Sequence, residues 1–352
     1  MTPLERRTVS SLALLYSFRM LGLFMVLPLL ALYAADLPGA DPLTIGLALG
    51  VYGLSQALLQ IPLGWLSDKL GRKPVIVGGL LVFALGSVVA GMAETIEGVV
   101  VGRALQGAGA IASTVMALVA DLTREEQRTK AMAIVGMSIG LSFAMALVLG
   151  PLVAAAGGLS AVFWFTTVLA IVGVAIVLLL VPTPPVGQMH DEVGARRGLF
   201  ARSLQDAGLL RLNFAVFSLH FVLMALFLVV PGLLLEVADL DRNSHWMVYL
   251  PALLLSIVGM VPMMIMAERK GRLHAMFLLA IVLLILAMTV ISAPASPLLL
   301  YLGMWLFFVG FNYLEATLPS LGAAVTLYWL EMAVETQREN PPWESVKVST
   351  MK

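Results

Sequence analysis

Ten long apolar segments, separated by short polar loops, constrain what this chain can fold into. A helix needs roughly 20 mostly apolar residues to cross the hydrocarbon core of a bilayer. Segments of that kind lie at 9–34, 43–67, 74–92, 97–120, 130–156, 160–181, 208–235, 245–267, 273–292 and 298–318. Because backbone amides in lipid must be satisfied within the segment, each one is expected to be an α-helix. The sequence therefore predicts an all-α, multi-pass membrane protein, whose first segment is too long for a secretory signal and is retained.

The small number of polar residues excludes several functional classes. Charged residues make up only 12% of the chain, and the absence of cysteine rules out disulfides, thiolate nucleophiles and thiolate metal ligands. The sequence has no phosphate-binding glycine loop, no spacing typical of a metal site and no nucleophile with a partnering base. We therefore expect a protein that is not an enzyme, needs no cofactor or metal, and has the lipid bilayer but no nucleic acid as a partner.

Basic residues are distributed unevenly among the loops. The N-terminus and the even-numbered loops together hold fifteen Lys and Arg residues, whereas the odd-numbered loops hold only Arg242. Lys and Arg accumulate in the cytoplasmic loops of membrane proteins. The sequence therefore predicts that the N-terminus and the even-numbered loops lie in the cytoplasm.

A proline-containing and basic segment divides the chain into two halves. We expect an N-terminal six-helix half at 1–181, a cytoplasmic linker at 182–207 and a C-terminal half with four helices at 208–320. An internal repeat supports this division, because the run that begins with Ser17-Phe18-Arg19 returns about 200 positions later as Ser218-Leu219-His220. The sequence thus predicts two related halves.

Residues 64–73 form the most informative polar stretch between two apolar segments. This stretch contains Gly64, Asp68, Gly71 and Arg72. Polar groups do not lie in hydrocarbon, so we predict a short loop at the membrane surface whose glycines permit a tight reversal. The pattern resembles the G-x-x-x-D-[RK]-x-G-R-[RK] signature of the major facilitator superfamily of transporters at every fixed position.

Two further segments are similar to the same family. The stretch from Gly102 to Gly109 resembles the R-x-x-Q-G-x-G pattern of the fourth helix. Gly140 and then Gly150-Pro151 resemble the pattern of drug and proton antiporters, although alanines occupy two positions where further glycines are common. The resemblance implies the facilitator fold of twelve helices, a bacterial inner-membrane location, and a substrate site near the bilayer midplane between the halves.

Several polar side chains are predicted to lie inside apolar segments, where a charge is costly and usually serves function. Arg19 lies about ten residues into the first helix, roughly 15 Å deep, and is expected to bind substrate or couple protons, or else to partner a carboxylate or carbonyls. Arg103 could do the same or reach the outer surface by snorkelling. His220 could exchange protons or simply pack as a neutral ring. Gln56 and Gln60 share a helix face and could bond a ligand or another helix.

The loop motif also predicts a conformational switch. The carboxylate of Asp68 can stabilise the positive N-terminus of a neighbouring helix, and Arg72 can reach Asp121 at the cytoplasmic end of the fourth helix. We expect Gly64, Asp68, Gly71, Arg72 and Asp121 to hold the cytoplasmic side closed. The resemblance assigns the helix that Asp68 addresses to the eleventh span. Lys69, Arg72 and Lys73 are also expected to fix the membrane topology, whether or not the motif acts as a switch.

The segment 321–352 does not fit the family pattern. It predicts at best a short interfacial helix followed by a polar tail that cannot span a membrane. We expect that the eleventh and twelfth helices are absent, that the segment derives from a shifted reading frame, and that a chain of this length does not transport.

These features together predict a secondary active transporter. In its intact form we expect proton-coupled efflux of small amphipathic molecules by alternating access, an interpretation that depends mainly on the resemblance. One alternative is proton-coupled uptake by symport. The other alternative is a truncated membrane protein that transports nothing.

Overall fold

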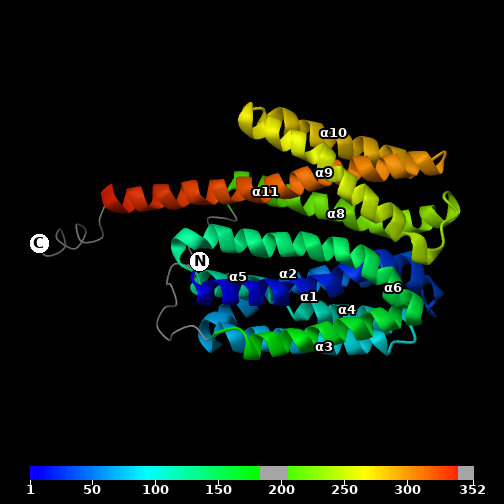
Figure 1. Ribbon diagram of the computed structural model, residues 1–352, viewed down its shortest axis with the longest axis horizontal. Coiled ribbons are helices and arrows are strands. Elements are labelled where there is room, and N and C mark those ends of the chain that lie inside the picture. Colours follow the sequence, from blue (N-terminus) through cyan, green and yellow to red (C-terminus); the bar gives the residue numbers. More distant parts are fainter. Residues whose placement is uncertain (183–204, 340–352) are drawn as a thin grey trace, which may run out of the picture. The chain divides into compact units, whose positions relative to one another are not determined.

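The computed structural model describes residues 1–182 and 205–339, with side chains described through residue 321. Within these ranges the chain is helical and contains no strand (Figure 1). The predicted all-α fold class is therefore confirmed.

The helices coincide with the apolar segments of the sequence. Their bounds are α1 Pro3–Tyr33, η1 Ala34–Asp36, α2 Pro42–Leu70, α3 Arg72–Gly91, α4 Ile96–Ala108, α5 Ala112–Asp121, α6 Glu125–Leu179, α8 Ala207–Glu236, η2 Arg242–Ser244, α9 Trp246–Arg269, α10 Leu273–Ser292 and α11 Pro297–Glu339. Nine helical segments of the described chain are long and apolar enough to cross a membrane. One of them, α6, has 55 residues with non-helical backbone at Gly157 and Gly158. Since α6 covers two predicted spans, the described helices account for the ten expected crossings.

By their contacts the residues form two compact units. The first unit comprises Met1–Ala195, Met224–Leu254 and Val290–Met304, and the second comprises Arg196–Leu223, Leu255–Thr289 and Trp305–Lys352. The division at a linker, expected at 182–207, remains a prediction, because residues 183–204 lie outside the described part of the chain.

In the first unit, α1 packs against α6, α3 against α4 and α6, and α2 against α4 (Figure 1). The core contains fully buried Leu12, Leu15, Ile76 and Leu118. The start of α2 is fixed by Asp41, whose carboxylate accepts hydrogen bonds from the Thr44 amide and hydroxyl. These bonds lower the pKa of the Asp41 carboxyl, since they favour its ionised form.

In the second unit, glycines allow helices to approach one another. A Cβ atom added at Gly310 of α11 would lie 2.7 Å from the Ala280 carbonyl oxygen of α10. The Asn312 amide of α11 donates a hydrogen bond of 2.7 Å to the Ser256 hydroxyl of α9. Within the membrane part of this unit, the three helices thus contact through both close backbone packing and an interhelical hydrogen bond.

The predicted loop at 64–73 is much shorter than expected. Helix α2 continues through Gly64 to Leu70 and α3 begins at Arg72, so Gly71 is the one residue between them. Gly71 has φ 92° and ψ 153°, a conformation that side chains disfavour and glycine adopts readily. The expectation of a polar loop was wrong because a single glycine suffices to reverse the chain.

The last described helix is longer than the sequence predicted. Helix α11 passes through Pro319 and continues to Glu339, whereas the last apolar segment ends at 318. The residues from Leu321 to Glu339 include three Ala, three Leu and three Glu, which favour helix. Residues 340–352 lie outside the described part of the chain, and the expected origin of 321–352 stays a prediction.

Candidate functional site

Arg19 lies inside α1 with 1% of its surface exposed. Its Nη2 atom donates to the Tyr52 hydroxyl at 3.2 Å, to Gln56 Oε1 at 3.3 Å and to the Gly109 carbonyl at 3.4 Å. The guanidinium also lies 5.7 Å from the centre of the Phe83 ring. Its Nε and Nη1 atoms are buried and have no hydrogen-bond partner among the described residues. Arg19 therefore contacts α2, α3 and the break between α4 and α5, and still has free donors.

Arg103 is equally buried, at 1% exposure. Its Nε donates to the Ala48 carbonyl at 3.3 Å and its Nη1 donates to Gln106 Oε1 at 2.8 Å. The guanidinium lies 4.5 Å from the centre of the Tyr52 ring, a cation–π distance. Arg103 thus lies within the helical packing, so the snorkelling alternative for this residue is wrong.

Tyr52 connects the two arginines. Its hydroxyl accepts from Arg19, and Arg103 lies over its ring. Sequence reasoning missed this residue. The available signal was a tyrosine within the second apolar segment, since a buried tyrosine hydroxyl usually finds a partner. We call Arg19, Tyr52, Gln56, Arg103 and Gln106 the arginine cluster.

The helices of the cluster approach closely because of small residues on α4. A Cβ atom added at Gly107 would lie 2.2 Å from the Tyr52 carbonyl oxygen. A Cβ atom added at Gly109, directly after α4, would lie 2.3 Å from the Gly79 carbonyl oxygen. Gln106 connects the cluster to α3, because its Nε2 donates to the Ser87 hydroxyl at 2.8 Å. The motif glycines of the fourth crossing therefore position its polar side chains.

The two predicted glutamines on α2 differ in their contacts. Gln56 bonds across helices to Arg19. Gln60 has a buried Oε1 atom without a partner, and its backbone carbonyl accepts from the Ser113 hydroxyl at 3.3 Å. One glutamine thus already has a cation as its partner, and the other has a free acceptor.

No carboxylate of the described residues forms an ion pair with the arginine cluster. Partners of Arg19 and Arg103 are hydroxyl, amide and carbonyl oxygens and aromatic rings. A buried charge is normally paired, because removing it from water is expensive. The cluster therefore combines two cations with only neutral partners.

The residues of the predicted switch do come together at the C-terminal end of α2, which the sequence predicts to be the cytoplasmic end. Arg72 Nε lies 3.1 Å from Asp121 Oδ2, and both side chains are less than a tenth exposed. Arg72 Nη1 donates to the Ser67 hydroxyl at 2.7 Å and to Asp68 Oδ1. The expected contact between Arg72 and Asp121 is present, and Ser67 is an additional partner that the sequence did not indicate. We call Ser67, Asp68, Arg72 and Asp121 the cytoplasmic latch.

Next to the latch, Lys73 binds the end of the sixth crossing. Its ammonium group donates to the Val181 carbonyl at 2.7 Å. A cation at this position satisfies a carbonyl left free after the helix end and interacts favourably with the helix dipole. Whether Asp68 addresses an eleventh span stays a prediction, since in the described residues its partner is Arg72.

His220 of α8 lies beside Glu315 of α11. The His220 Nε2 and Glu315 Oε2 atoms are 3.7 Å apart, and each side chain is a little under half exposed. His220 Nδ1 contacts the Val216 carbonyl at 3.0 Å, and its ring meets Phe311 edge to face. Glu315 was not among the predicted site residues, although a carboxylate within an apolar segment is the signal that could have identified it.

The glycines and proline predicted for an antiporter-like fifth crossing lie on α6. A Cβ atom added at Gly150 would lie 3.3 Å from Leu29 Cδ1 and 3.4 Å from the Met25 carbonyl oxygen, both on α1. A Cβ atom added at Gly140 would have no described atom within 4 Å. Pro151 lies inside the helix. Gly150 thus packs against α1, and Gly140 has open space beside it.

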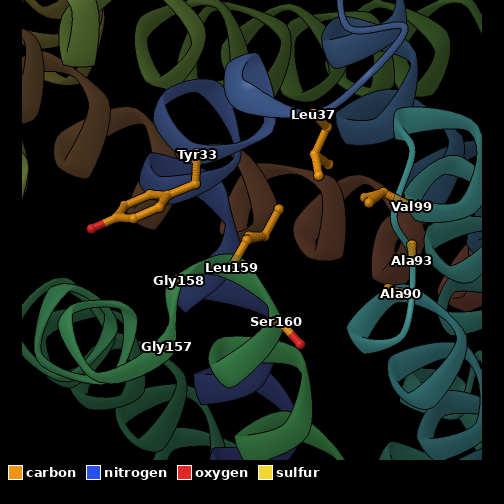
Figure 2. A pocket seen from close by; sticks show the side chains of 9 residues that line it. All are labelled: Tyr33, Leu37, Ala90, Ala93, Val99, Gly157, Gly158, Leu159 and Ser160. Atoms are coloured by element: carbon orange, nitrogen blue, oxygen red, sulfur yellow. The ribbon is translucent and has the colours of Figure 1, made fainter.

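Figure 2 shows a pocket of about 250 Å³ that none of the predicted site residues lines. It is formed where the backbone of α6 breaks, by Tyr33, Leu37, Ala90, Ala93, Val99, Gly157, Gly158, Leu159 and Ser160. The Leu37, Val99 and Leu159 side chains converge there, whereas the Tyr33 ring points away. Within the described ranges, no group of His, Asp and Glu side chains could hold a metal ion.

Comparison with known proteins gives one consistent result. Residues 12–332 match the family model described as Major Facilitator Superfamily. The chain is 47% identical over 322 residues to the inner membrane transport protein YajR of Escherichia coli strain K12, covering 91% of this chain and 71% of YajR. It is 34% identical to an uncharacterized transporter of Buchnera aphidicola, covering 90% of this chain and 82% of that protein.

A solved structure shares the fold. A bacterial homolog of the human lysosomal transporter Spinster, in an inward-facing and unoccupied conformation, matches with a TM-score of 0.71 and 15% identity. The match covers 94% of this chain and 79% of that chain.

Proposed function

The chain belongs to the major facilitator superfamily, and from this premise we propose that it exports small amphipathic molecules across a bacterial inner membrane in exchange for protons. The family consists of membrane transporters for small molecules and not of enzymes. Proton coupling, the direction of transport and the cytoplasmic N-terminus are parts of the proposal. The expectation that a chain of this length does not transport is the competing hypothesis, and the test below decides between the two.

The observation that carries proton coupling is the pair formed by His220 and Glu315. Imidazole and carboxylate groups can each take up and release a proton, so a His–Glu pair is the kind of group that can carry one through a transport cycle. The pair lies within apolar helices, and each side chain is a little under half exposed. Binding a proton there changes a charge inside the membrane, which is what a coupling site requires.

Export is supported by the fifth crossing, where Gly150-Pro151 resembles the pattern of drug and proton antiporters. Gly150 packs against α1, the helix that carries Arg19. We infer that this helix contact transmits movement between the fifth crossing and the arginine cluster. The arginine cluster itself is the proposed binding site for the transported molecule.

The cytoplasmic latch gives the proposal its conformational part. Arg72 connects the α2–α3 turn to the end of α5 through Asp121. Removing one partner of a buried ion pair strongly destabilises the conformation that contains it, because the other charge then remains unpaired. We propose that the latch stabilises the conformation that is closed to the cytoplasm and opens during the transport cycle.

The test uses purified protein in liposomes with an acidic lumen and a pH-sensitive dye inside. A ligand is first identified by thermal shift against a chemical library. In molecules whose cytoplasmic face is outside, antiport predicts that ligand added outside accelerates proton exit, whereas symport predicts acceleration by ligand in the lumen.

The matched variants are His220→Asn and Glu315→Gln, which remove the titrating groups and keep their size. Both are expected to bind the ligand and to lose ligand-dependent proton movement. Proton movement at the wild-type rate in both variants would refute the coupling site. A folded wild-type chain that binds ligand and moves no protons would favour the non-transporting alternative.

A further inference from the structure

The arginine cluster contains two buried cations without a buried anion. Arg19 and Arg103 are each 1% exposed, and their contacts among the described residues are neutral oxygens and aromatic rings. Both arginines also touch the same side chain, Tyr52. Two like charges around one tyrosine disfavour each other, and low-dielectric surroundings increase this effect. An anion bound at the cluster would therefore stabilise both cations.

The same cluster has hydrogen-bond donors to offer. Arg19 Nε, Arg19 Nη1 and Arg103 Nη2 are buried atoms that find no hydrogen-bond partner in the part of the chain that the structure describes. Arg19 makes all three of its hydrogen bonds through Nη2, at distances of 3.2 to 3.4 Å. These bonds are long for a guanidinium, whose charge-assisted bonds to carboxylates are typically about 2.7–2.9 Å. The free donors and the long bonds both indicate a site that lacks its acceptor.

We propose that the transported molecule is an amphipathic organic anion, and that its carboxylate or other acidic group binds between Arg19 and Arg103. This inference rests on the proposed transport function and specifies its substrate class. Guanidinium groups suit carboxylate and phosphate-type oxygens because they offer several N–H donors in one plane. Phe83 and Tyr52 place aromatic rings beside the two guanidinium groups, and such rings suit contact with the apolar body of an amphipathic acid.

The ligand reaches the cluster from the transport path and not as a lipid headgroup. Arg19 lies about ten residues into its apolar segment, roughly 15 Å along the helix, whereas phospholipid headgroups stay near the surface. Gln56 bonds Arg19 and is only half-buried, so it is less enclosed than Arg19, Tyr52, Arg103 and Gln106, the other members of the cluster. An arriving acid can therefore replace Gln56 as the partner of Arg19.

The experiment measures binding to the purified protein in nanodiscs of phosphatidylcholine, with no ion gradient. The probes are acids paired with their neutral amides: naphthalene-2-carboxylate with its carboxamide, and decanoate with decanamide. Each pair shares its apolar body, so the difference in affinity reports the charge alone. We expect at least tenfold tighter binding of the acids to the wild-type protein.

Variants assign the preference to Arg19. Arg19→Met is expected to bind acid and amide equally, whereas Arg19→Lys keeps the charge and retains a reduced preference for the acid. The control Arg7→Met removes an exposed arginine near the N-terminus and should behave like the wild type. If Arg19→Met does not fold, the acid and amide affinities of the wild type and of Arg19→Lys still show whether the site prefers acids and whether that preference depends on Arg19.

Three results would overturn the proposal. These are equal binding of acid and amide by the wild type, no binding of any acid by the folded wild type, and an unchanged preference in folded Arg19→Met. A fourth arm uses nanodiscs containing phosphatidylglycerol; loss of acid binding there would assign the site to a lipid phosphate and also contradict the proposal. Because no gradient is used, acid preference without proton movement would refute the proposed export and leave this inference intact.

Discussion

At the scale of single residues, the arginine cluster shows what the sequence could and could not predict. The depth of Arg19 followed from counting residues along an apolar segment, but its complete burial against neighbouring helices did not follow from that count. Tyr52 was missed, because which residues of one helix face those of another depends on packing that no single segment determines. The same holds for Glu315 beside His220.

The hydroxyl of Tyr52 is expected to matter separately from its ring. Tyr52→Phe removes the acceptor for Arg19 and keeps the ring under Arg103. A hydrogen bond to a charged group contributes about 1.5–3 kcal/mol, so this variant should have a measurably lower free energy of unfolding than the wild type. Tyr52→Ala should lose more, since the ring contact is lost as well. Equal thermal stability of wild type and Tyr52→Phe would show that the contact is energetically unimportant.

At the scale of elements, the turn between α2 and α3 differs most from its prediction. The motif indicated the right position and the right partner, Asp121, but not that seven of its residues continue α2. Helix ends depend on local capping, and polar residues such as Ser67 and Asp68 can remain helical where the helix leaves the lipid. Gly71 alone accounts for the reversal.

Gly71→Ala is expected to destabilise this turn. The backbone at Gly71 lies in a region that is almost exclusive to glycine, where another residue costs about 1–3 kcal/mol. The control is Gly78→Ala in the interior of α3, where an added Cβ meets nothing and alanine favours helix. Thermal unfolding should separate the two variants. If Gly71→Ala unfolded no earlier than Gly78→Ala, the turn would not need a glycine.

The cytoplasmic latch predicts a shift in conformational population. Asp68→Asn, Arg72→Ala and Asp121→Ala each remove a charge from the latch and should favour the conformation open to the cytoplasm. Because the chain has no cysteine, single cysteines placed on the cytoplasmic side report accessibility without background. Labelling should be faster in all three variants than in the parent. Identical labelling rates in the four proteins would contradict the latch.

At the scale of the whole molecule, hydropathy predicted the ten crossings and their approximate bounds because crossing lipid imposes a minimum length on each segment. The continuation of α11 to Glu339 was not predicted, since helix propensity outside the membrane is a weak signal. The cytoplasmic position of the N-terminus is a prediction from fifteen basic residues against one.

Orientation can be measured in the same cysteine-free chain. Thr2→Cys should react with a membrane-impermeant maleimide only after the cytoplasmic side is opened, whereas Asp41→Cys should react in intact cells. Both positions lie at helix starts outside the apolar segments. Labelling of Thr2→Cys in intact cells would reverse the proposed topology.

Proton-coupled export is tested most directly by accumulation of an identified ligand in inside-out membrane vesicles with an acidified lumen. The wild-type protein is expected to accumulate the ligand as protons leave the lumen. Arg19→Ala should lose at least about tenfold in initial rate at equal amounts of inserted protein, because the cation that holds the ligand is gone. Accumulation by Arg19→Ala at the wild-type rate would contradict the account.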